Sequence, residues 1–143
     1  MSLRYLLDTN VLSEPLRVSP NSNVMAQLQQ HQQEMAIASI VWHELWFGCC
    51  RLPESKKRQA IEQYLQQVIH RNIPILPYSA DAAQWQATER ARLASIGLTP
   101  AFADGQIAAI AKTNNLILVT GNVTDYQNFS QLEIENWYDS SNG

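Results

Sequence analysis

Several features of secreted and membrane proteins are scarce or missing in this chain of 143 residues. Its only cysteines are Cys49 and Cys50, and adjacent cysteines rarely bridge each other and lack the spacing of a zinc site. No apolar run approaches the length of a membrane span, and the first run is interrupted by Asp8. We therefore expect reduced thiols, no secretory signal, no membrane partner and a cytoplasmic location.

Positive charge is also scarce, because the formal net charge is −3 and does not by itself indicate a nucleic-acid-binding protein. Residues 51–92 nevertheless contain seven Lys or Arg against four Asp or Glu, a local net charge of +3 that leaves −6 for the rest. This distribution favours an acidic site beside a surface that attracts phosphates. The candidate phosphate contacts are Arg51, Lys56, Lys57 and Arg58, although a solvated helix start would contain the same residues.

Short apolar segments alternate with longer amphipathic ones along the sequence. Strands are expected at 5–7, 35–37, 73–76, 116–119 and 132–134, and helices at 11–16, 24–32, 40–51, 56–70, 79–94 and 103–113. This alternation predicts an α/β fold, a three-layer α/β/α sandwich with a mostly parallel central sheet. Without repeats or domain linkers, residues 1–138 are expected to form a single domain and 139–143 a disordered tail.

The first strand ends at an acidic residue, Asp8. The segment from Tyr5 to Glu14 reads Tyr-Leu-Leu-Asp-Thr-Asn-Val-Leu-Ser-Glu, and a helical pattern begins at Val11. A carboxylate at the point where a strand gives way to a helix lies at the edge of the sheet where α/β folds bind ligands. Asp8 is therefore the first candidate site residue, and other acids are expected to converge on it.

Glu44 is the second candidate, because it interrupts an apolar stretch of the helix expected at 40–51. Its neighbours at helical spacing are Ile40, Val41, Phe47 and Gly48. A charge on an apolar stripe is costly unless it is paired or bound to a cation. An ion pair with His43 or a distant arginine would satisfy it, but the nearby Asp8 favours a metal-binding or catalytic role.

Three polar residues in the last third of the chain complete the candidate set. Asp104 occurs in the first turn of a helix rich in small residues, where an aspartate can also simply complement the helix dipole. Thr120 and Asn122 follow a late apolar strand, and since parallel strands end at one edge, they should emerge near Asp8. Asn122 is equally typical of a turn, and Asp125 of the start of a short helix.

Together these segments resemble the motifs of PIN-domain ribonucleases, and in particular of the VapC/FitB-like toxins of bacterial toxin–antitoxin pairs. The matching segments are Asp8-Thr9-Asn10 with the following Val-Leu-Ser-Glu, Glu44, Ala103-Asp104 with Ile107-Ala108-Ala109, and Thr120-Gly121-Asn122. The resemblance implies that Asp8, Glu44 and Asp104 bind Mg²⁺ or Mn²⁺. Many members have an aspartate where this chain has Asn122, so a second metal site is in question, and Asp125 is an alternative ligand.

The resemblance also implies partners: an RNA substrate, tRNA among the options, a small antitoxin protein and a second copy of the chain in a homodimer. An antitoxin segment is expected to cover the groove and to insert a basic residue among the acids. Trp42, Trp46 and Phe47 lie beside Glu44 in the sequence. They are expected either in the core or in a contact with the antitoxin or the second subunit.

The chemistry of phosphodiester hydrolysis suits such a set of acids. One or two hard cations held by carboxylates activate a water molecule and stabilise charge on the attacking and leaving oxygens. The expectation is therefore a metal-dependent endoribonuclease in which Asp8, Glu44, Asp104 and Asn122 form the catalytic site. Thr9 and Thr120 are expected to orient water or outer ligands.

Two other classes of protein use acids at strand ends. A phosphate-accepting receiver domain needs a lysine after a late strand, whereas Lys112 precedes the strand at 116–119, which disfavours that class. A PIN-like module that binds RNA or protein without cleaving it is the alternative, because Asn122 is neutral. Metal-dependent turnover would distinguish the enzyme from the binding module.

Overall fold

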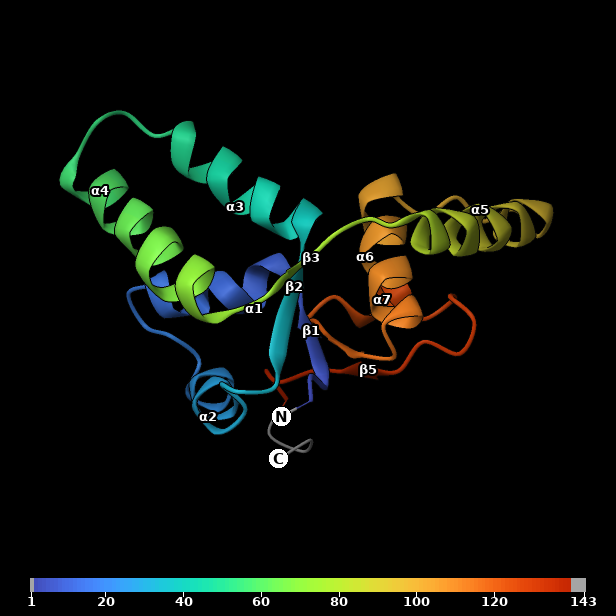
Figure 1. Ribbon diagram of the computed structural model, residues 1–143, viewed down its shortest axis with the longest axis horizontal. Coiled ribbons are helices and arrows are strands. Elements are labelled where there is room, and N and C mark those ends of the chain that lie inside the picture. The colour runs from blue at the N-terminus through green and yellow to red at the C-terminus, as the bar shows by residue number, and fades with distance from the viewer. Residues whose placement is uncertain (1, 140–143) are drawn as a thin grey trace.

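The computed structural model describes residues 2–139 and shows a parallel sheet between layers of helices (Figure 1). The five strands lie in the order β3–β2–β1–β4–β5, and every neighbouring pair is parallel. The strands are β1 Tyr5–Leu7, β2 Met35–Ala38, β3 Ile75–Leu76, β4 Ile117–Val119 and β5 Ile134–Glu135. The predicted three-layer α/β/α fold is confirmed, while the tail predicted at 139–143 falls, from residue 140 onward, outside the described residues.

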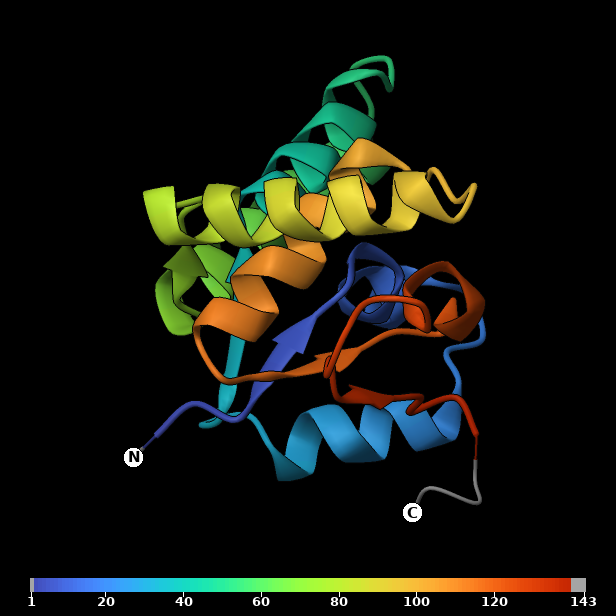
Figure 2. The same ribbon diagram turned by 90° about the vertical axis from the view of Figure 1, so that its right-hand side faces the viewer.

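The helices cover the sheet on both faces. They are α1 Thr9–Ser13, η1 Glu14–Leu16, α2 Ser22–Gln30, α3 Ser39–Cys50, α4 Lys56–Gln63, η2 Tyr64–His70, α5 Ala80–Ser95, α6 Phe102–Thr113 and α7 Val123–Tyr126. In Figure 2, α5 and α6 lie above the strands and α2 lies below them. The single helix predicted at 56–70 is an α-helix that continues as a π-helical segment, η2.

The strands at the centre of the sheet are short and apolar because both of their faces are covered. Leu6, Ile37 and Leu118, from β1, β2 and β4, are fully buried. On the face that carries α2, Trp137 packs edge-on against Tyr5 with a ring-centroid distance of 5.2 Å. Within residues 2–139, no helix is both long enough and apolar enough to cross a membrane.

Gly105 allows α6 to approach α5 closely, and its substitution gives a first prediction. The buried Gln86 of α5 donates a hydrogen bond to the carbonyl of Phe102, and a β-carbon at residue 105 would overlap its Nε2 atom. Gly105→Ala should therefore lower the free energy of unfolding by roughly 1–3 kcal/mol, as measured by urea denaturation.

The matched control for this prediction is Gly48→Ala. Gly48 lies inside α3, and a β-carbon there would meet nothing within 4 Å. Removing a helical glycine without a clash should stabilise the protein by about 0.5–1 kcal/mol. Equal effects of the two substitutions would mean that the overlap with Gln86 does not limit packing at Gly105.

Candidate functional site

The register of the two central strands places Asp8 beside Thr120. Leu7 of β1 pairs with Val119 of β4, so the residues that follow these two strands are neighbours. The backbone N–H of Asp8 extends the ladder by donating to the carbonyl of Val119 at 2.9 Å. The prediction that Thr120 emerges near Asp8 is therefore confirmed.

Both carboxylate oxygens of Asp8 are held by hydrogen bonds. Oδ1 accepts from the backbone N–H of Thr9 at 2.8 Å, and Oδ2 accepts from the hydroxyl of Thr120 at 2.8 Å. The Thr120 hydroxyl in turn accepts from the backbone N–H of Asn122 at 3.0 Å. Asp8 caps the N-terminus of α1, where the helix dipole favours a negative charge. The buried carboxylate is consequently fixed in one orientation.

Tyr126 holds the carboxylate of Asp104 in place by a hydrogen bond. The hydroxyl of the buried Tyr126 donates to Oδ1 of Asp104 at 3.3 Å. Burial, followed by the charge of Asp125, raises the pKa of Asp104; Asp8 adds to this, and the Tyr126 hydrogen bond opposes it. Burial and the neighbouring carboxylates raise the pKa of Tyr126 as well, so its hydroxyl remains a proton donor.

Tyr126 was not predicted as a site residue. The only signal in the sequence was an aromatic residue directly after Asp125. Whether such a residue turns toward an acid depends on the packing of α7 against α6, which the sequence does not reveal.

Four of the predicted site residues line one cleft of about 250 Å³. They come from the segment after β1, from α3, from α6 and from the segment after β4. The lining consists of Asp8, Thr9, Asn10, Ile40, Glu44, Ala103, Asp104, Ile107, Asn122 and Tyr126. Asp125 lines an adjoining pocket that shares Asp104 with the cleft, and it acts on the cleft through its charge.

Glu44 lies in the cleft as predicted. The predicted reason, a charge on a buried apolar stripe of the helix, was wrong. The side of α3 that faces the core carries Val41, Leu45 and Cys49, whereas Glu44 is exposed. Its charge is therefore not on a buried stripe, and no salt bridge of Glu44 occurs among the described residues. Its position follows from α3 starting directly after β2, beside the central strand β1.

The aromatic and basic residues around α3 divide into packed and exposed groups. Trp42 and Trp46 are half-buried against the core with a ring-centroid distance of 5.8 Å, whereas Phe47 is 51% exposed. Arg51 lies over the Phe47 ring. Arg58, one of the candidate phosphate contacts, donates to Glu62 and to the carbonyl of Leu52.

The donors of the cleft fit a hard divalent cation. They are carboxylate and amide oxygens, and no cationic side chain is among the described residues that line the cleft. Burial, and after it the charges of Asp125 and Asp8, raises the pKa of Asp104, which a bound cation would offset. Within residues 2–139, no group of three His, Cys, Asp or Glu side chains is arranged to hold a metal ion together. A cation in this cleft would therefore complete its coordination with water, as Mg²⁺ commonly does.

The partial burial of the Asp104 carboxylate, together with the neighbouring acids, predicts that Asp104→Asn stabilises the fold. The pKa of Asp104 is raised in the folded state, so the protein loses stability as the pH rises through the range in which the Asp104 carboxyl ionises. Asparagine does not ionise, so Asp104→Asn avoids this loss. The Tyr126 hydroxyl can still donate to the amide oxygen. We expect a melting temperature a few degrees higher at pH 7, measured by calorimetry, and little difference at about pH 3.

Asp81→Asn is the matched control for this stability measurement. Asp81 is exposed in the first turn of α5, where its charge complements the helix dipole. Its replacement should leave the melting temperature unchanged or slightly lower. A decrease for both variants would contradict the cost of ionising the partly buried Asp104 carboxylate.

Known proteins are similar to this chain in sequence and in fold. The PIN domain family matches residues 5–129. The toxin FitB of Neisseria gonorrhoeae is 34% identical over 140 residues, which cover 94% of this chain and 99% of that protein. The tRNA(fMet)-specific endonuclease VapC of Shigella flexneri is 31% identical over 137 residues, covering 94% and 98%.

Solved structures agree with these relatives. The crystal structure of FitAcB from Neisseria gonorrhoeae superimposes with a TM-score of 0.87 at 33% identity, covering 94% of this chain and 98% of that one. The structure of FitAB bound to a DNA fragment gives a TM-score of 0.88 at 30% identity, covering 94% and 96%. The likeness therefore extends over nearly the full length of both chains.

Proposed function

Because the chain belongs to the PIN domain family, we propose that it is a divalent-metal-dependent endoribonuclease and the toxin of a toxin–antitoxin pair. One observation carries the proposal: Asp8, Glu44, Asp104 and Asn122, far apart in the sequence, line the same cleft. Relatives named as a VapC endonuclease and a FitB toxin support the activity and the biological role.

In this proposal, Asp8, Glu44 and Asp104 would hold Mg²⁺ or Mn²⁺ partly through water molecules, because no three acids within residues 2–139 are arranged as direct ligands of one ion. Asn122 would be a neutral oxygen donor and Asp125 a nearby charge. When bound, the cation lowers the pKa of a water molecule and offsets charge on the phosphate. The Thr120 hydroxyl donates to Asp8 and accepts from the backbone N–H of Asn122, so it fixes the Asp8 carboxylate and keeps one lone pair that can accept from a water molecule. Tyr126 gives Asp104 its corresponding support.

The partners follow from the relatives. Neighbouring structures include FitAB and the VapBC2 complex from Rickettsia felis bound to a promoter DNA fragment. We propose that this chain likewise binds a cognate antitoxin, acts on RNA in the cytoplasm and forms a homodimer. Its homodimer is testable by light scattering of the purified chain.

A PIN-fold module that binds without cleaving is the second candidate, and Asn122 is the observation that favours it. Asn122 lines the cleft with a neutral side chain, which weakens the attraction for a second cation. The protein would then capture RNA or a protein partner without turnover.

Cleavage of a labelled total-RNA pool by the purified, partner-free chain distinguishes the two candidates. The reaction is run with Mg²⁺, with Mn²⁺ and with EDTA. The nuclease predicts fragments with either metal and none with EDTA. A folded chain that leaves the RNA intact under both metals would favour the binding module.

A further inference from the structure

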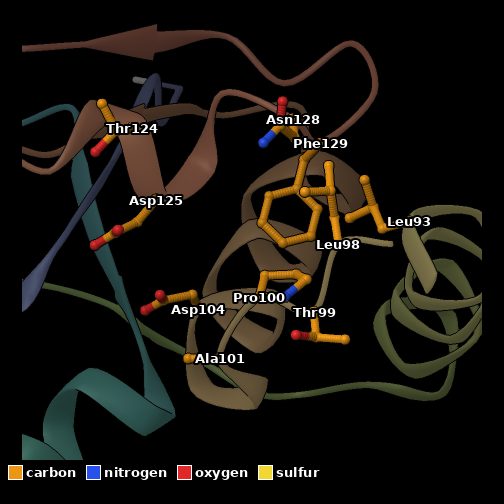
Figure 3. Close-up of a pocket in the computed structure, with 10 residues that line it drawn as sticks. All are labelled: Leu93, Leu98, Thr99, Pro100, Ala101, Asp104, Thr124, Asp125, Asn128 and Phe129. Atoms are coloured by element: carbon orange, nitrogen blue, oxygen red, sulfur yellow. The ribbon is translucent and has the colours of Figure 1, made fainter. Parts of the chain in front are cut away.

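A second pocket of about 380 Å³ adjoins the acidic cleft (Figure 3). The two hollows share Asp104 in their linings, so they are neighbours on the surface of the protein. The lining comes from the end of α5, the loop before α6, the start of α6 and the segment from α7 onward. It consists of Leu93, Leu98, Thr99, Pro100, Ala101, Asp104, Thr124, Asp125, Asn128 and Phe129.

The pocket has an acidic end and an apolar end. In Figure 3, the carboxylates of Asp104 and Asp125 point to the same side, away from Leu93 and Leu98. Phe129 lies at the apolar end, and its buried ring packs near Trp85, with 6.0 Å between ring centroids. Such a pocket suits a flat, largely apolar group whose attached polar chain continues toward the cleft.

One wall of the pocket is held in place by a buried carboxylate. Glu89 of α5 accepts from the backbone N–H of Ser130 at 2.7 Å and binds Arg92 through both oxygens, at 3.0 and 2.9 Å. Arg92 also donates to the carbonyl of Asn128 at 2.8 Å. These bonds anchor the loop that carries Asn128 and Phe129, so the pocket is preformed.

Apart from Asp104 and Asp125, the polar side chains that line the pocket are neutral donors and acceptors. Among the residues that the structure describes, the side chains of Thr99, Thr124 and Asn128 make no hydrogen bond. The lining contains no lysine or arginine, and the carboxylates of Asp104 and Asp125 lie at the acidic end of the pocket. A phosphate would therefore be repelled, whereas an uncharged base would find both an apolar surface and hydrogen-bonding partners.

Resting on the nuclease function proposed above, we propose that this pocket binds one unstacked adenine beside the scissile phosphate. The base lies against Pro100, Leu98 and Phe129, while its ribose passes the acidic end and places the adjoining phosphate in the cleft. Asn128 reads the base edge, because an asparagine amide matches the donor and acceptor pair of adenine. Guanine is selected mainly by arginine or lysine, which the pocket lacks.

Mapping of cleavage sites in a random-sequence RNA tests the proposal. The wild type should favour adenine at one fixed position flanking the cut by about tenfold or more. Asn128→Ala should make cleavage nearly independent of the base at this position. Leu98→Trp should abolish the preference for adenine, because the larger side chain fills the pocket. The matched controls are Gln127→Ala and Ile96→Trp, whose residues are exposed in the same two segments but do not line the pocket.

The outcomes separate this inference from the nuclease function. Metal-dependent cleavage without a base preference, or a preference that survives Leu98→Trp, would overturn the adenine pocket and leave the nuclease intact. If Leu98→Trp weakens antitoxin binding but leaves the cleavage pattern unchanged, the pocket serves a protein partner and the proposal is wrong. Circular dichroism confirms that each variant is folded.

A binding measurement that needs no activity decides the inference even if the nuclease function fails. Adenosine and uridine, which carry no phosphate, are titrated into the isotope-labelled protein in EDTA and followed by amide chemical shifts. Adenosine should shift the backbone signals of Thr99 and Asn128 in the wild type and not in Leu98→Trp, and uridine should shift them less. Equal shifts for both nucleosides, or none, would overturn the proposal.

Discussion

Replacing Asp8 by asparagine is expected to reduce RNA cleavage by roughly a thousandfold or more. Asp8 is the acid that strand pairing, α1 and Thr120 together hold in one orientation, so it contributes a preorganised negative charge. Asparagine has nearly the same shape but no charge, and it offers a cation one neutral oxygen in place of a carboxylate. The loss is measured as initial rates on a defined RNA with Mg²⁺ or Mn²⁺.

The fold should survive this change. The amide oxygen of the new residue can accept from the N–H of Thr9, and its NH₂ group can donate to the hydroxyl of Thr120. Asp81→Asn removes one exposed carboxylate elsewhere and should cleave at the wild-type rate. Full activity in both Asp8→Asn and Asp104→Asn would contradict the proposed role of these acids in binding the cation.

Glu89→Gln is expected to lower the free energy of unfolding by roughly 2–3 kcal/mol at pH 7. Glu89 is nearly buried, and its Arg92 partner lowers its pKa to about 2, assisted by the N–H of Ser130. Glutamine keeps one acceptor but loses the charge and part of the bond to Arg92. Urea denaturation at neutral pH measures the difference.

The pH dependence of this effect has a definite sign. Because the pKa of Glu89 is depressed in the folded state, its stabilisation is fully present above the ordinary carboxyl pKa near 4.5 and is lost as pH falls toward 2. The wild type and Glu89→Gln should therefore converge in acid. Glu54→Gln, which removes an exposed partner of Arg58, should change stability by less than about 1 kcal/mol at any pH. If the difference in free energy of unfolding between the wild type and Glu89→Gln does not change with pH, the charge of Glu89 is not the cause of the stabilisation.

The part of the site that lies at the ends of the two central strands was predictable from the sequence. A short apolar run followed by Asp8, and another followed by Thr120, predict two parallel strands that end side by side, and the pairing of Leu7 with Val119 follows that rule. Asp104 also lies in the cleft, at the start of a helix rich in small residues, as its surroundings in the sequence indicated.

The remaining features depend on which face a helix buries. Helix α3 is apolar around most of its circumference, so the sequence could not show that Val41, Leu45 and Cys49 face inward and Glu44 outward. The bond between Glu89 and Ser130 joins residues 41 positions apart and has no local signal. That bond anchors the loop that forms one wall of the second pocket, and the sequence alone gave no indication of this pocket.

The position of β1 between β2 and β4 has a consequence for the synthesis of this protein. The first strand to leave the ribosome is the middle of the finished sheet, and its partner across Leu6 and Leu118 is made almost last. Such distant pairing delays folding until the late strand is available. The hydrogen bond between Thr120 and Asp8 can form only at that stage, so the acidic cleft is assembled late, after β4 has paired with β1.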